Sequence, residues 1–147
     1  MSDETSEVQG AAIITVSWVG TGVYAVTALI ATVFPDGFGV VATIVSLALF
    51  VIGCAVFFWA YFVAVQRSRT DLIGIGGLYF LQGTAPRTVQ FRLLGSLVVE
   101  VVVAVVTASI RLYSALAFGF LVPVFGLGMC GLWAARHGTF EPRPAPE

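Results

Sequence analysis

The chain has 147 residues, of which 59% are hydrophobic and 10% are charged, and its formal net charge is −1. Soluble domains carry about 25% charged residues, so this composition excludes an ordinary soluble domain and predicts an all-α integral membrane protein. A charge balance this close to neutral indicates no nucleic-acid partner. All seven basic residues are arginines, a bias typical of GC-rich genomes that leads us to expect a bacterial source.

The first half of the chain predicts two membrane spans joined by a tight turn. Residues 11–34 carry no charge, and about 20 apolar residues are enough to cross a bilayer. Pro35-Asp36-Gly37 is a turn signal, so the next helix must return antiparallel. Residues 38–65 exceed the required length, so this second span must tilt or project beyond the hydrocarbon. It carries a ridge of small residues suited to close helix packing, namely Ala42, Ser46, Gly53 and Ala60.

Residues 66–90 form the long connection between the second and third spans. Their apolar stretch, residues 72–81, is too short to cross a hydrocarbon core of about 30 Å. It also contains three glycines, which disfavour a regular helix. We therefore expect an irregular segment at the membrane interface. Four arginines in or just after this connection are candidates for contact with lipid headgroups: Arg67, Arg69, Arg87 and Arg92.

The second half of the chain predicts another hairpin, with spans at 91–110 and 114–135. Pro123 lies inside the fourth span and cannot donate a hydrogen bond to the carbonyl of Gly119, so we expect a kink there. The four helices thus form two antiparallel hairpins within one transmembrane domain, residues 1–137. The proline-rich remainder, residues 138–147, is predicted to be a disordered tail.

The placement of the arginines predicts the orientation, because cytoplasmic loops are enriched in basic residues. The long connection with Arg92 carries four arginines and the C-terminal region two, whereas the turns at 35–39 and 111–113 carry none and one. We expect a multi-pass protein of the inner (plasma) membrane with both termini cytoplasmic.

Between Arg92 and Arg111 the third span contains a single charge, Glu100, eleven residues before Arg111. At about 1.5 Å per residue, this position lies near the middle of the bilayer. A lipid-facing acid at that depth would cost about 2.5 kcal/mol or more. The polar residues of this span lie along one side of the helix, which we call the polar seam. We therefore expect the polar seam to face the bundle or a partner chain, with the valines toward lipid. At about 100° per residue, the seam comprises Arg92, Ser96, Glu100, Thr107 and Arg111.

Two roles stay open for Glu100. Intramembrane acids often mark ion, proton or substrate pathways, so Glu100 with Ser96, Thr107 and Thr21 is a candidate proton-coupled or cation-binding site. The alternative is a neutral carboxyl that hydrogen-bonds neighbouring helices as a structural element. Thr21 and Cys54 are predicted at a similar depth and are candidate partners. No arginine is predicted at that depth, so the carboxyl must be protonated, bind a cation or meet a partner chain.

The remaining reactive residues predict neither catalysis nor a cofactor. Cys54 and Cys130 lie in apolar stretches without CxxC spacing, so we interpret them as buried thiols rather than a disulfide or metal site. His137 follows the last span, where it cannot ligate a haem between helices. The sequence contains no hydrolase or kinase constellation, so we expect a protein that is not an enzyme.

Two functional classes follow from these observations. The favoured one is a non-catalytic accessory or scaffold subunit of a membrane complex, in contact with the lipid bilayer and with other membrane protein subunits or a second copy. The alternative is a small proton- or cation-coupled transporter, or a flippase-like homodimer, that uses Glu100. The sequence names neither a substrate nor a partner.

Overall fold

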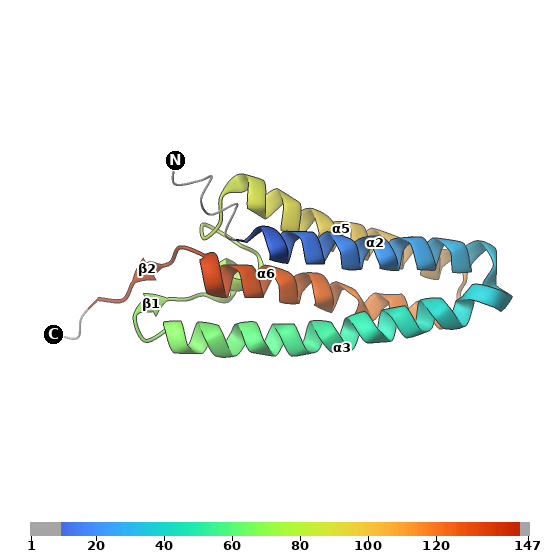
Figure 1. The fold of residues 1–147 in the computed structure, drawn as a ribbon, viewed down its shortest axis with the longest axis horizontal. Coiled ribbons are helices and arrows are strands. Elements are labelled where there is room, and N and C mark those ends of the chain that lie inside the picture. The colour runs from blue at the N-terminus through green and yellow to red at the C-terminus, as the bar shows by residue number, and fades with distance from the viewer. Residues whose placement is uncertain (1–9, 145–147) are drawn as a thin grey trace.

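The structure is a computed structural model that describes residues 10–144. Four long helical stretches run side by side in alternating directions and form a bundle (Figure 1). They are α2 (Ala11–Val33), α3 (Pro35–Arg67), α5 (Arg87–Ile110), and a fourth stretch made of the 3₁₀ helix η1 (Ala115–Leu121) and α6 (Pro123–His137). The short elements are β1 (Asp71–Leu72), α4 (Ile75–Tyr79) and β2 (Glu141–Pro142).

All four stretches are long and apolar enough to cross a membrane. Their outer faces carry exposed valines, leucines, isoleucines and aromatic side chains, which suit contact with lipid tails. The chain is therefore a four-span helical membrane protein, and the predicted fold class is confirmed. The α2–α3 and α5–η1 turns lie at one end of the bundle, and the long connection lies at the other end with the beginning of α2 and the segment after α6 (Figure 1).

α3 is the longest helix, with 33 residues, or about 50 Å at 1.5 Å per residue. This length exceeds a hydrocarbon core of about 30 Å, as the sequence predicted. The predicted ridge of small residues is buried within the bundle and is extended by one more alanine: Ala42, Ser46, Gly53, Ala60 and Ala64.

The backbones of α3 and α6 approach each other closely. A Cβ atom added at Gly53 would lie 2.6 Å from the Phe125 nitrogen, and one at Gly128 would lie 2.9 Å from the Gly53 carbonyl oxygen. Neither position has room for a side chain. Such close approach at small residues drives helix association in lipid, where the hydrophobic effect is absent.

The fourth span is interrupted at Pro123. A 3₁₀ helix ends at Leu121, and α6 begins with Pro123 at its first position. Proline suits a helix start because it has no N–H to leave unpaired and its φ is already helical. The disturbance predicted at Pro123 is thus present, but it is a new helix start rather than a kink within one continuous α-helix.

The connection between α3 and α5 contains one short strand and the five-residue helix α4. Leu81 and Gly83 have positive φ values of 57° and 69°, so the chain reverses there, and glycine adopts such a conformation at little cost. The segment is far too short to span, in agreement with the predicted irregular segment between the second and third spans.

The segment after α6 has a defined course where the sequence predicted disorder. Glu141–Pro142 pairs antiparallel with Asp71–Leu72, and the Arg143 N–H donates to the Thr70 carbonyl at 2.7 Å. Composition alone does not reveal these partners, because they come from a distant part of the chain. The structure thus differs from the predicted tail over residues 138–144, and residues 145–147 lie outside the described range.

Candidate functional site

The polar seam of α5 faces the interior of the bundle. Ser96 and Glu100 are 0% exposed and Thr107 is 1% exposed. The opposite face, which includes Val98, Val101, Val102, Val105 and Val106, is exposed. The prediction that the polar seam of α5 faces the bundle is therefore confirmed. The two arginines at the ends of the seam are exceptions to this burial, because Arg92 is exposed and Arg111 is only partly buried.

The seam of α5 meets a matching set of hydroxyl groups on α2. Because α2 and α5 are the first and third spans, they run in the same direction. Contacting residues on the two helices therefore keep a constant separation in sequence. The Ser17 and Ser96 hydroxyl oxygens lie 2.7 Å apart, and one turn further on the Thr21 hydroxyl oxygen is hydrogen-bonded to Glu100 Oε1 at 2.8 Å. Thr21 is thus the partner that the sequence proposed for the carboxyl.

The second oxygen of Glu100 meets the beginning of α6. The Gly126 N–H donates to Glu100 Oε2 at 3.2 Å. This N–H is free because the Val122 carbonyl, its partner in a regular α-helix, accepts instead from the Phe125 N–H. The first turn of α6 is therefore tighter than an α-helical turn. A Cβ at Gly126 would lie 2.6 Å from Glu100 Oε2 and 3.2 Å from Leu97 Cα. Only glycine lets the carboxyl approach so closely.

We call Thr21, Glu100 and Gly126 the Glu100 cluster. It joins three helices, α2, α5 and α6, and each carboxyl oxygen has one protein partner. A carboxyl oxygen supplies the acceptor that a free N–H group at the beginning of a helix needs. The carboxyl is thus packed dry, with uncharged partners on both sides.

The hydrogens of the Glu100 cluster favour a protonated carboxyl. The Thr21 hydroxyl has one proton but lies near two acceptors, Glu100 Oε1 at 2.8 Å and the Ser17 carbonyl at 2.9 Å. With Glu100 protonated, its O–H donates to Thr21 while Thr21 donates to Ser17, and both contacts are satisfied. With Glu100 ionised, Thr21 can donate its one proton to only one of the two acceptors, and the other acceptor is left without a donor.

Four other residues singled out from the sequence lie outside the Glu100 cluster. The Thr107 hydroxyl donates to the Val103 carbonyl of its own helix at 2.8 Å. Cys54 is half-buried and Cys130 is buried, and both are free thiols. Arg111 donates through Nε and Nη2 to the Thr32 carbonyl near the end of α2 at 3.2 and 3.1 Å.

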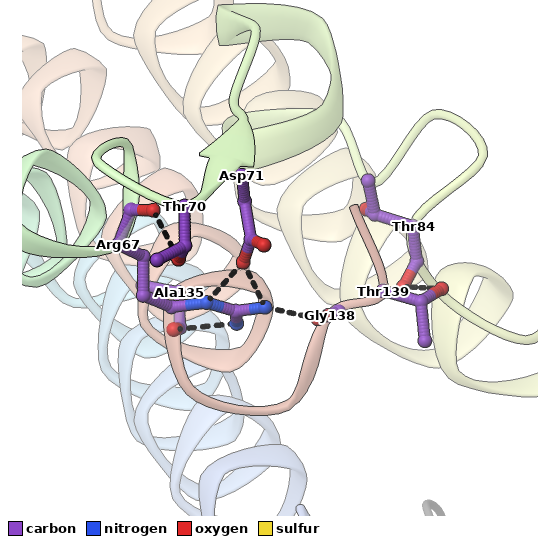
Figure 2. A network of polar contacts seen from close by, with 7 residues as sticks. All are labelled: Arg67, Thr70, Asp71, Thr84, Ala135, Gly138 and Thr139. Carbon is purple, nitrogen blue, oxygen red and sulfur yellow. Dashed lines mark hydrogen bonds and ion pairs between the residues drawn. The ribbon is translucent and has the colours of Figure 1, made fainter. Parts of the chain in front are cut away.

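A second polar cluster lies at the other end of α6 (Figure 2). Arg67, the last residue of α3, donates from Nη1 to the Ala135 carbonyl and from Nη2 to the Gly138 carbonyl, both at 3.1 Å. Its Nη2 also lies 2.9 Å from Asp71 Oδ2. We call these four residues the Arg67 cluster. It holds the end of α3, the long connection and the start of the tail together.

The Arg67 cluster changes the interpretation of the candidate headgroup contacts. Arg67 is used within the protein and also lies over the Phe140 ring, 5.1 Å from its centroid. Arg69, Arg87 and Arg92 are exposed and stay free to meet lipid. The sequence contained one signal for this cluster, the i, i+4 spacing of Arg67 and Asp71. It contained no signal for the carbonyls of Ala135 and Gly138.

Comparisons with protein-family models, with curated proteins and with solved structures found no match. Within residues 10–144, no group of three His, Cys, Asp or Glu side chains is placed to hold a metal ion.

Proposed function

We propose that this chain is a non-catalytic subunit of a membrane complex. The observation that carries this proposal is the packing of Glu100, which is 0% exposed and has both oxygens bonded to neighbouring helices. A group that loads and releases ions or substrate needs access to water. A carboxyl packed dry between three helices is better suited to fixing their mutual positions.

The outer face of α3 is the surface that best suits a partner helix. α3 has the smallest buried share of the four spans, and its small-residue ridge is already used inside the bundle. On the opposite face, large apolar side chains recur at spacings of four and seven residues, which place them on one stripe. The stripe comprises Val40, Ile44, Val51, Phe58 and Phe62.

Site-specific photocrosslinking tests this proposal. A photoreactive amino acid at Phe58, introduced in cells of the source organism, should give a protein adduct of higher mass that mass spectrometry identifies. The same amino acid at Val102, exposed on α5, is the matched control and should give lipid adducts. Lipid adducts alone at both positions would argue against a partner on this face.

A coupled transporter is the second candidate, favoured by two features of the Glu100 cluster. The shared proton of Thr21 favours a carboxyl that carries a proton, and α6 begins beside it after a break in the span. A helix break is a place where a transport protein can bend. If Glu100 is a coupling group, Glu100→Gln should abolish transport yet preserve folding, whereas a structural Glu100 tolerates this change.

We also propose that the protein lies in the inner (plasma) membrane with both termini cytoplasmic. The arginine-rich connection lies at the same end as Gly10 and the tail (Figure 1), which supports a shared side. In a variant with Cys54 and Cys130 replaced by alanine, a cysteine at Gln82 should resist an impermeant thiol reagent in intact cells. A cysteine at Gly37 should react, and the reverse pattern would invert the orientation.

A further inference from the structure

A lateral groove lies between the end of α3 and α4. Its volume is about 510 Å³. Phe57, Tyr61 and Val65 line it from α3, and Ile75, Leu78 and Tyr79 line it from α4. The groove does not touch the Glu100 cluster or the Arg67 cluster, so neither of the contacts described above accounts for it.

The walls of the groove present carbon rather than polar atoms. The Tyr79 hydroxyl donates to the Phe57 carbonyl at 3.2 Å, and the Ser68 hydroxyl at the rim donates to the Val65 carbonyl at 2.7 Å. Burial raises the pKa of the Tyr79 hydroxyl above its usual 10, and Tyr61 adds to this effect. Tyr79 therefore stays a neutral donor across the physiological range, with its polar end satisfied by α3.

The groove is built into the fold rather than left by a loose loop. The Tyr79 ring stacks on the Phe57 ring, with centroids 4.3 Å apart and planes 10° apart. On its other side Tyr79 meets Gly131 of α6, where an added Cβ would lie 2.5 Å from the ring. A glycine there lets Tyr79 sit deep between α3 and α6, which holds α4 at a fixed distance from α3.

The position of the groove determines which molecules can reach it. It lies beside the last third of α3, at the end of the bundle that carries the exposed Arg69, Arg87 and Arg92, and arginines beside a span indicate the level of anionic lipid headgroups. Its outer rim is formed by exposed side chains, Val65 and Ile75 among them. A groove of this kind opens sideways at the level of the lipid headgroups, so an acyl chain can enter it from the bilayer.

We propose that this groove binds one acyl chain of an anionic phospholipid whose headgroup is held by Arg69. Ser68 lines the groove, and Arg69 follows it in sequence and is exposed. Arg67, the other arginine at this end of α3, is occupied by Asp71 and two carbonyls. The exposed charge one residue beyond the groove lining therefore complements a phosphate, and the walls complement the hydrocarbon of the acyl chain. This site does not depend on the proposed function.

Photocrosslinking of the intact protein in vesicles tests the site. The vesicles contain phosphatidylcholine alone or with one-fifth phosphatidylglycerol, and the photoreactive amino acid replaces Ile75. The control position is Val16, an exposed residue of α2 towards the same end of the bundle. We expect phosphatidylglycerol to be enriched several-fold in the adduct at position 75, and adducts at position 16 to follow the bulk composition. Bulk composition at both positions would overturn the proposal.

Two further variants separate the acyl contact from the headgroup contact. Val65→Trp should fill the groove and lower the adduct at position 75 several-fold, while Val98→Trp on the outer face of α5 should leave it unchanged. Arg69→Gln should remove the preference for phosphatidylglycerol, and Arg92→Gln should retain it. An unchanged preference in Arg69→Gln, or a protein adduct at position 75 in place of lipid, would show that the occupant is not the lipid proposed.

Discussion

The two ends of α6 are each met by an ionisable side chain from another helix, but in different surroundings. At the first turn, Glu100 of α5 accepts from the Gly126 N–H. At the last turn, Arg67 of α3 donates to the Ala135 and Gly138 carbonyls. Each side chain supplies what that helix end lacks, namely an acceptor for a free N–H at the beginning and donors for free carbonyls at the end. The chemistry of capping is therefore shared.

The surroundings separate the two contacts. Glu100 is fully buried and its hydrogen-bond partners are uncharged, whereas the Arg67 side chain is 31% exposed and has Asp71 as a countercharge. Where water can enter, it replaces a lost partner. In a dry site the remaining group stays unsatisfied and the full desolvation penalty applies. The same type of contact should thus contribute more to stability at the beginning of α6 than at its end.

The largest effect is expected for Glu100→Leu. Leucine fits the volume but leaves the Gly126 N–H without its acceptor, at a cost of up to about 3 kcal/mol. Unfolding by SDS titration in mixed micelles, followed by circular dichroism, measures this loss. Glu100→Gln is the matched control, because its amide can still accept from Gly126 and donate to Thr21, and it should change stability by less than about 1 kcal/mol. Equal losses in both variants would indicate that the negative charge itself is needed.

Gly126→Ala should have the next largest effect. Its Cβ would lie 2.6 Å from Glu100 Oε2 and 3.2 Å from Leu97 Cα, so α5 and α6 must separate. Such overpacking costs about 2 kcal/mol. Gly22→Ala on α2 is the control, since a Cβ there meets nothing within 4 Å, and it should be neutral or slightly stabilising. A neutral Gly126→Ala would show that the beginning of α6 is not tightly held.

Features that depend on the residue pattern of a single helix could be predicted from the sequence. Span lengths follow from runs of apolar residues, and the burial of Ser96, Glu100 and Thr107 follows from their recurrence at about 100° per residue. The small-residue ridge of α3 was predicted on the same basis. Each of these predictions uses residues of a single helix, so no knowledge of how the helices pack was needed.

The partners of the two polar clusters could not be predicted, because they depend on the register between helices. The position of α6 along the bundle depends on its close packing against α3 at Gly53 and Gly128 as well as on α5, and this position decides which N–H faces Glu100. The sequence predicts a kink at Pro123 rather than a helix start, because the helix start depends on the 3₁₀ helix before it. Likewise, nothing in the composition of the tail indicated that β1 and Arg67 would order it.

Arg67→Gln should have a smaller effect than either change at the beginning of α6. It removes the charge and most of the contacts to the Ala135 and Gly138 carbonyls. Both residues are buried, but the Arg67 side chain that covers them is 31% exposed, so water can replace the lost guanidinium and we expect a loss of about 1 kcal/mol. Arg92→Gln, exposed on α5, should be neutral. Limited proteolysis gives a second measurement, because loss of the guanidinium that lies over the Phe140 ring should open the Phe140–Glu141 bond to chymotrypsin. A loss larger than that of Glu100→Leu would reverse the comparison between the two ends of α6.

The smallest effect is expected for Asp71→Asn, which removes the countercharge and leaves Arg67 in place. The carbonyls of Ala135 and Gly138 can still accept from the guanidinium, so only the ion pair is weakened. Ion pairs this exposed contribute about 0.2–1 kcal/mol. Salt screens such pairs, so the difference between Asp71→Asn and the unmodified protein should shrink as sodium chloride is raised. The effect of Glu100→Leu should not change with salt, because no mobile ion enters a dry site. If instead the Glu100→Leu loss falls with salt while the Asp71→Asn loss stays constant, the buried contact is electrostatic and open to ions, and the distinction drawn between the two ends of α6 is wrong.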